Sequence, residues 1–121
     1  MQQEIGRGLL VVTADVDPEN EVEFNRWYNE EHVPERLTVP GFLGARRFVA
    51  VEGQPKYIAI YEMESPEVLR SEFYRKLRDN PTEWTGRVLA RARTNRVVYR
   101  QLFPAQGAFT DRSGPAAHRG P

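Results

Sequence analysis

The residues best suited to chemistry in this chain are Glu31 and His32, which follow closely on the aromatic pair Trp27 and Tyr28. Imidazole titrates near neutral pH, and a positioned imidazole typically accelerates a proton transfer by about 10²–10⁴-fold. A neighbouring carboxylate can share that proton or orient a substrate hydroxyl. The sequence therefore predicts catalytic roles for His32, as a proton shuttle, and for Glu31 beside it.

Four further residues are predicted to bind the substrate. Trp27, Tyr28 and Tyr61 would line an aromatic cleft suited to a flat apolar ligand, with His32 at its wall and a volume of roughly a few hundred Å³. Arg46 and Arg47 occupy consecutive strand positions and so face opposite sides of a sheet. One of them, assigned as Arg47, would stabilise an enolate or carboxylate, although adjacent arginines are commonly surface residues.

Each of these residues also has a structural interpretation. His32 can cap the carbonyl groups at a helix C-terminus, where a donor or positive charge is favoured. Glu31 can lie at a rim or pair with an arginine, and the aromatic residues can be core. Metal ligation is not expected, because the only other histidine is His118 and the chain has no cysteine.

The elements that must position these residues can be read from pattern. Residues 8–14 form a short apolar strand. A helix over about 18–32 begins at Asp17 and Pro18, and places Phe24, Trp27, Tyr28 and Glu31 on one face. Pro34 is expected to end this helix.

The remainder of the chain predicts a hairpin, a second helix and a last strand. The hairpin has strands over 43–52 and 56–63, and the helix runs from Ser65 to about residue 79 with a Leu69, Phe73 and Leu77 stripe. Residues 82–92 are expected to be irregular or a short helix around Trp84, before a strand over 94–103. The Gly- and Pro-rich tail, 104–121, is expected to be disordered, which leaves 1–103 as a single domain.

This order, β-α-β-β-α-β, predicts a ferredoxin-like α+β fold: a four-stranded antiparallel sheet with two helices on one face. The first strand is apolar on both sides, since Leu10 and Val12 alternate with Leu9 and Val11. Two helices cover only one face, so the other face needs a partner. A second copy is the simplest one, giving a homodimer whose two sheets form a dimeric α/β barrel.

Charge and composition exclude several classes of partner. Lys+Arg and Asp+Glu both number 17, so no net field favours nucleic acid or a membrane surface. The acidic stretch 19–35 and the basic stretch 87–100 are expected to meet within or between chains. The absence of cysteine fits a reducing compartment, and the run 9–12 is too short for a membrane span or signal peptide. The expected location is the cytoplasm.

A family resemblance rests on Phe24, Trp27, Tyr28, His32 and Pro34, followed by Pro40-Gly41-Phe42. This helix and turn resemble those of the EthD-like families in the dimeric α/β barrel superfamily. The resemblance implies a small homodimer with a cleft between sheet and helices. Members include cofactor-free monooxygenases, polyketide cyclases, lactone isomerases, haem enzymes and proteins of unknown role, so the fold carries over more strongly than the function.

Three functions therefore stay open. The first is a cofactor-independent enzyme of cyclase, isomerase, dehydratase or monooxygenase type that acts on an apolar or aromatic oxygenated metabolite, with His32 as the proton shuttle. The second is a non-catalytic dimeric module that binds a hydrophobic small molecule or a protein. The third is haem binding, which would make His32 a ligand; no cofactor is expected under the first two.

Overall fold

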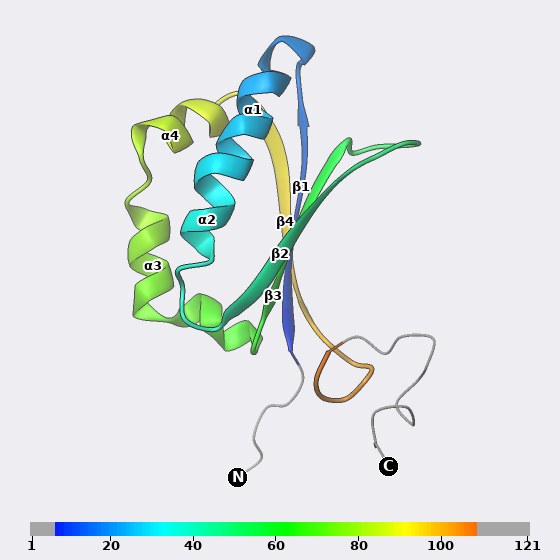
Figure 1. Cartoon of the computed structure of the whole chain (residues 1–121), viewed down its shortest axis with the longest axis vertical. Coiled ribbons are helices and arrows are strands. Elements are labelled where there is room, and N and C mark those ends of the chain that lie inside the picture. The colour runs from blue at the N-terminus through cyan, green and yellow to red at the C-terminus, as the bar shows by residue number, and fades with distance from the viewer. Residues whose placement is uncertain (1–6, 109–121) are drawn as a thin grey trace.

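The structure is a computed structural model that describes residues 7–108. Its four strands form one antiparallel sheet in the order β2-β3-β1-β4, and the helices all lie on one side of that sheet (Figure 1). The predicted ferredoxin-like α+β architecture is confirmed. The strands are β1 (Gly8–Val16), β2 (Phe42–Val49), β3 (Tyr57–Met63) and β4 (Ala92–Arg100).

The helical layer contains more elements than the two helices expected. The first helical stretch is continuous and consists of η1 (Pro18–Asn20), α1 (Glu21–Trp27), a π-helical turn η2 (Tyr28–His32) and α2 (Val33–Arg36). The second consists of a 3₁₀ turn η3 (Pro66–Arg70) and α3 (Glu72–Asp79), and α4 (Glu83–Leu89) follows as a third helix.

The expectation that Pro34 ends the first helix is wrong. The helix passes this proline because the backbone widens into the π turn just before it, where the Val33 N–H donates to the Tyr28 carbonyl, five residues back. In a regular α-helix the proline ring would clash with the carbonyl four residues earlier, and the wider turn relieves that contact. The helix ends only at Arg36, so Leu37 rather than His32 stands at its C-terminal end.

The second helix is interrupted where a continuous one was predicted. Ser71 has extended backbone, and its hydroxyl accepts from the Tyr74 N–H at 3.1 Å, so it caps a new helix. This restart changes which residue faces the sheet: Tyr74 is buried, whereas Phe73 is 48% exposed. The prediction of a buried stripe is therefore wrong for Phe73, whereas Leu69 and Leu77 do pack against the core.

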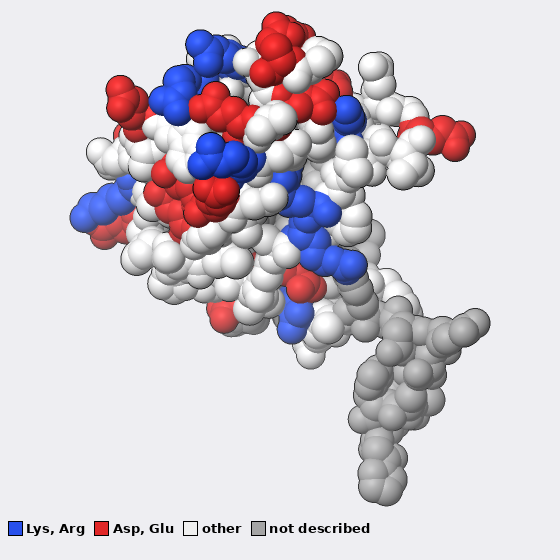
Figure 2. Space-filling model, turned by 45° about the horizontal axis from the view of Figure 1, so that its top comes forward, with Lys and Arg blue, Asp and Glu red and all other residues white. Residues whose placement is uncertain are grey.

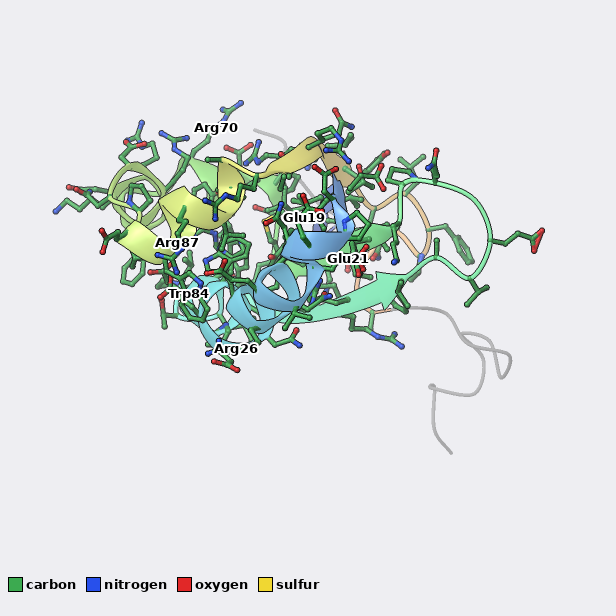
Figure 3. All side chains as sticks on the ribbon, turned by 90° about the horizontal axis from the view of Figure 1, so that it is seen from above. Glu19, Glu21, Arg26, Arg70, Trp84 and Arg87 are labelled. Carbon is green, nitrogen blue, oxygen red and sulfur yellow. The ribbon has the colours of Figure 1, made fainter. Side chains whose placement is uncertain are left out.

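Helix α4 begins at Thr82 and is locked to α1 through buried polar contacts. The Trp27 indole Nε1 donates to the Thr85 hydroxyl at 3.0 Å, and that hydroxyl lies 2.9 Å from Glu31 Oε2. On the outside of the same contact, Arg26 lies over the Trp84 ring at 5.5 Å (Figure 3). The short helix around Trp84, one of two expectations for residues 82–92, is confirmed.

The acidic and basic stretches meet within the chain at the contact between α1 and α4, and the basic stretch also reaches Asp17, just before the acidic one. Arg87 on α4 pairs with Glu23 on α1 at 2.7 Å, and Arg93 on β4 pairs with Asp17 at 3.4 Å. Figure 2 shows basic and acidic side chains intermingled over the top of the molecule. No wide surface of one sign is visible on this face, in keeping with the balanced composition.

The sheet face opposite the helices has no helix over it (Figure 1). Register pairs place apolar side chains in rows across this outer face, including Val11 opposite Ile60 and Val97, and Leu9 opposite Tyr99. Phe48, Val97 and Tyr99 are exposed large hydrophobic residues there. A cavity of about 270 Å³ on this face is lined by Leu9, Gly44, Ala45, Arg46, Ile60, Glu62 and Ala108.

The predicted tail falls largely beyond the structure: residues 109–121 lie outside the described residues. The boundary at residue 103 stays a prediction. Within residues 7–108, no helix is both long and apolar enough to cross a membrane.

Replacing Thr85 by valine is expected to lower the free energy of unfolding by about 1–3 kcal/mol, because the buried Trp27 N–H loses its acceptor while side-chain volume is kept. Urea denaturation followed by fluorescence measures this. Thr94→Val, at an exposed β4 position, is the matched control and should change stability by less than about 0.5 kcal/mol. Equal urea midpoints for the two variants would show that the Trp27 hydrogen bond does not stabilise the α1–α4 contact.

Candidate functional site

His32 lies inside the helical layer, in the middle of the continuous first helix. Its ring stacks on Trp27 with centroids 4.4 Å apart and meets the Tyr28 ring edge-on at 5.1 Å. Only 9% of the residue is exposed. Because the helix continues to Arg36, the interpretation of His32 as a C-terminal cap is wrong.

Four buried polar atoms on residues near His32 have no hydrogen-bond partner within residues 7–108. They are His32 Nδ1, Tyr61 Oη, Arg36 Nη1 and Arg47 Nε, and we call these four residues the polar cluster. Arg36 Nη1 does lie 3.5 Å from Glu35 Oε1, an ion-pair distance without hydrogen-bond geometry. A buried polar group left unpaired costs about 1–3 kcal/mol, so such a group calls for an explanation such as a ligand.

The electrostatics of the polar cluster favour a neutral imidazole. Burial, and then the charges of Arg36 and Arg47, lower the pKa of His32 to about 3. Burial also raises the pKa values of Tyr61 and Tyr28 above the ordinary phenol value, and the two hydroxyls interact with each other although without good hydrogen-bond geometry. At neutral pH the site therefore offers an uncharged imidazole and protonated phenols beside two cations.

Arg47 is the inward-facing member of the Arg46-Arg47 pair, as assigned from the sequence. It pairs across the sheet with buried Ala59, and its guanidinium carbon lies 4.3 Å from the centre of the Tyr28 ring. Arg46 lies over Phe48, which belongs to the outer face. Arg47 is only partly buried and so forms the boundary between the polar cluster and solvent.

Arg47 is held by two asparagines of the first helix. Its Nη2 donates to Asn25 Oδ1 at 2.8 Å, and its Nη1 donates to Asn29 Oδ1 at 2.9 Å. These two hydrogen bonds place the guanidinium against the Tyr28 ring and leave Nε directed into buried space.

Glu31 and Trp27 are placed differently from the expectation. Glu31 Oε2 accepts hydrogen bonds from the hydroxyls of Thr82 and Thr85, so its carboxylate is used at the α1–α4 contact. It does not partner His32 Nδ1, and the predicted proton-sharing pair is not formed. Trp27 is fully buried beneath His32 with its indole N–H on Thr85, where it supports the imidazole from behind.

The predicted open cleft with His32 at its wall is not among the four cavities described for residues 7–108. His32 lines none of the four cavities delineated over residues 7–108, and the cavity of about 270 Å³ lies on the outer face of the sheet. The aromatic residues fill the space between helix and sheet. The centre of the Tyr61 ring lies 5.9 Å from that of Phe42 and 6.5 Å from that of His32. Tyr28 and Tyr61 are thus brought to His32 as expected, in a packed arrangement.

Three residues of the site were missed by sequence reasoning. Arg36 follows His32 by four residues, and a helix continuing past Pro34 would have placed both on one face. Asn25 and Asn29 also lie four residues apart, but neither residue type gave a signal without knowledge of where Arg47 points.

The described residues offer no ready metal or haem site. Within residues 7–108, no group of three or more His, Cys, Asp or Glu side chains is arranged to hold a metal ion. Haem needs an open pocket beside its histidine, and His32 is packed between Trp27 and Tyr28 instead. Haem binding finds no support in this arrangement.

The polar cluster can perform proton transfer coupled to charge stabilisation. The imidazole is a weak base in the unliganded site, because its pKa is about 3, and negative charge on a ligand oxygen beside Arg36 and Arg47 would raise that pKa. The two guanidinium groups and a phenol hydroxyl would stabilise this negative oxygen. In the low dielectric of a buried site these interactions are stronger than in water.

Comparison with solved structures gives the same fold in several small proteins. An ethyl tert-butyl ether D (EthD) family protein from Bacillus halodurans has a TM-score of 0.55 at 13% identity, covering 81% of this chain and 100% of its own. SnoaB, a cofactor-independent oxygenase from Streptomyces nogalater, has a TM-score of 0.58 at 13% identity, covering 82% of this chain and 98% of its own.

A third neighbour was solved with a bound ligand. The monooxygenase from the gene ActVA-Orf6 of Streptomyces coelicolor, in complex with nanaomycin D, has a TM-score of 0.58 at 19% identity, covering 88% of this chain and 93% of its own. These likenesses confirm the predicted resemblance to the EthD-like proteins at the level of fold.

A search of curated proteins gave no match. A family model, described as a domain of unknown function (DUF4286), matches residues 8–99, which span β1 to β4 and the whole polar cluster. The chain belongs to this DUF4286 family.

Proposed function

We propose that this protein is a small enzyme of the oxygenase type that acts on a flat, oxygenated aromatic compound without a cofactor of its own. The observation that carries the proposal is the polar cluster: within residues 7–108, His32 Nδ1 and Arg47 Nε are buried without a partner, beside a Tyr61 hydroxyl that contacts only Tyr28 and an Arg36 nitrogen that contacts only Glu35. A ligand carbonyl or hydroxyl would satisfy these atoms, and the surrounding aromatic rings would pack against a flat ring system.

His32 is the base in this proposal. Its Nδ1 removes a proton from a carbon conjugated with a ligand carbonyl, and the resulting enolate oxygen lies against Arg36, Arg47 and the Tyr61 hydroxyl. The enolate then gives electrons to O₂. In the overall reaction a CH₂ group and O₂ become a carbonyl group and one molecule of water, so no external reductant is needed.

A ligand would reach the polar cluster beside Arg47. Arg47 is partly buried and its partner Asn29 is exposed, so a ligand that enters beside this pair comes directly to Tyr28, on which Arg47 lies. Because the interior is packed in the present arrangement, binding requires side chains next to Tyr28 to move. Such a change of rotamers is common at binding sites.

The solved neighbours support the reaction type. SnoaB is described as a cofactor-independent oxygenase, and the Streptomyces coelicolor neighbour is a monooxygenase that holds nanaomycin D. At such low sequence identity, the likeness to these neighbours shows a shared fold and nothing more. The residues of the polar cluster, rather than the neighbours, are the argument for chemistry here.

A second candidate function is a non-catalytic dimeric module that binds a hydrophobic molecule or a protein. The observation in its favour is the filled interior around His32, which lines none of the four delineated cavities. Under this alternative Trp27, Tyr28 and His32 are core residues, and the exposed outer face of the sheet is the functional surface.

We also propose a homodimer and a cytoplasmic location. The rows of apolar side chains on the outer face, with Val97, Tyr99 and Phe48 exposed, support self-association of the two sheets. The absence of cysteine supports a reducing compartment.

Oxygen uptake with anthrone as the probe tests the enzyme proposal, because the CH₂ of anthrone is conjugated with its carbonyl through two aromatic rings, and its product is anthraquinone. His32→Ala should lower the rate by about a hundredfold or more, since the base is lost. Glu31→Gln should leave the rate unchanged, because the Glu31 carboxylate accepts hydrogen bonds from Thr82 and Thr85. A His32→Ala variant that consumes oxygen as fast as the wild type would rule out this role.

The buried neutral state of His32 predicts a specific loss of stability in acid. Its pKa falls from the ordinary 6.5 to about 3 on folding, so the unfolded chain binds a proton that the folded chain excludes between these pH values. Stability from this group is complete above about pH 6.5 and is lost as the pH falls toward 3. His32→Phe removes the titration and keeps an aromatic ring on Trp27.

Between pH 7 and pH 4.5 the wild type should lose about 2.5 kcal/mol more unfolding free energy than His32→Phe, measured by urea denaturation at both pH values. The carboxylates are the same in both proteins and cancel in the difference. Parallel losses in the two proteins would mean that His32 titrates normally in the folded state.

Native mass spectrometry of freshly purified protein tests the dimer and reports any retained ligand. We expect twice the mass of one chain, and a monomer for Ile60→Lys, which places a charge in the middle of the outer face. Val51→Lys, at a fully exposed loop position, is the control and should stay dimeric. A monomeric wild type at micromolar concentration would refute the proposed barrel.

A further inference from the structure

We infer that Asn25 and Asn29 hold Arg47 as an uncompensated positive charge, which makes the site selective for an aromatic ligand that carries an anionic oxygen, a carboxylate or an enolate. This inference rests on the proposed function and names the substrate class of that same site. We call Asn25, Asn29 and Arg47 the amide clamp.

The partners of Arg47 are neutral where carboxylates are the common choice. Both terminal nitrogens of its guanidinium donate to amide oxygens, at 2.8 Å to Asn25 and 2.9 Å to Asn29. Arginine pairs most strongly with carboxylates, which fix its position and also cancel its charge. Two amides fix the position and leave the charge available to a ligand.

The nearest acid of this hydrogen-bond chain is already neutralised by a different cation. Glu21, at the start of α1 (Figure 3), accepts from Lys56 Nζ at 2.9 Å and from the Tyr57 hydroxyl at 2.7 Å. These contacts hold the pKa of the Glu21 carboxyl below its usual range. The carboxylate thus stays with Lys56, and Arg47 keeps its charge.

The orientation of the Asn25 amide is locked by the same chain. Its Nδ2 donates to the Glu21 backbone carbonyl at 3.0 Å and to the Tyr57 hydroxyl at 3.2 Å. With both donors used on that side, Oδ1 faces Arg47, as only an oxygen acceptor can. Asn25 is therefore a positioning residue, and the network behind it fixes the guanidinium over Tyr28.

The clamped guanidinium has one nitrogen that makes no hydrogen bond, and that nitrogen is buried. Arg47 Nε is buried and unpartnered, while its carbon lies 4.3 Å over the centre of the Tyr28 ring and 5.8 Å from that of Tyr57. An anionic oxygen on a flat ring would accept from Nε while the ring packs among these aromatic side chains. A neutral ligand of the same shape would gain the packing and lose the charged hydrogen bond.

Two isosteric probes test this inference: 2-naphthoate, which is an anion, and 2-naphthamide, which is neutral. Titration calorimetry on the wild-type chain should show the anion binding at least about tenfold more tightly. Asn29→Asp supplies a carboxylate to Arg47 at an exposed position without a change of size, and should reduce that preference to less than about threefold.

Two further variants separate charge from position. Asn29→Ala removes one amide but adds no charge, and should retain more of the preference for naphthoate than Asn29→Asp does. Asn20→Asp adds the same charge at the far end of the helix, outside the amide clamp, and should retain the whole preference for naphthoate. Equal losses in Asn29→Ala and Asn29→Asp would overturn the role of charge.

A wild-type protein that binds both probes equally, or neither, would also overturn the inference. The proposed enzyme function fails on a different result, namely oxygen uptake that does not depend on His32. If the protein prefers naphthoate but its oxygen uptake does not depend on His32, the inference about the amide clamp is supported and only the enzyme proposal is refuted.

Discussion

One backbone hydrogen bond determines the geometry of the candidate site: the bond from the Val33 N–H to the Tyr28 carbonyl, which closes the π turn. It lets the first helix continue through Pro34 to Arg36. Tyr28, His32 and Arg36 consequently follow one another at four-residue intervals along one helix. If the helix ended at His32, Arg36 would belong to a loop and the imidazole would lie at a helix end open to water.

The interior that this helix covers combines strong apolar packing with polar groups that lack partners. Trp27, Phe24, Tyr61, Met63 and Val39 are essentially fully buried, and burying side chains of this size provides most of the stability of a small domain. The unpaired atoms of the polar cluster subtract from it. Groups that lower stability in this way are concentrated at functional sites in natural proteins, where a ligand completes their hydrogen bonds.

Sequence patterns predicted the sheet better than the helices. Short apolar runs rich in β-branched residues, bounded by turn signals, predicted the strands, and the order of elements predicted how they form one sheet. The helical errors arose at Pro34 and Ser71, where a local rule was overridden: a π turn accommodated the proline, and a serine inside an apparently continuous helix capped a new one. In the site, residue type and the alternation of strand positions predicted correctly that Tyr28, Tyr61 and Arg47 lie near His32. The position of Glu31 could not be predicted, because its partners Thr82 and Thr85 belong to α4 and its cap, and the pattern left the presence of that helix open.

The π turn also constrains how this sequence can vary in length. A π turn holds one residue more than the α-helical turn it replaces, so it is the form that a single-residue insertion takes inside a helix. Deleting one residue between Tyr28 and His32 would restore regular α-helical winding and bring the Pro34 ring against the carbonyl four residues before it, which is the contact that the π turn relieves. Among related chains, the spacing between the aromatic pair and Pro34 should therefore tolerate substitution far better than a gap.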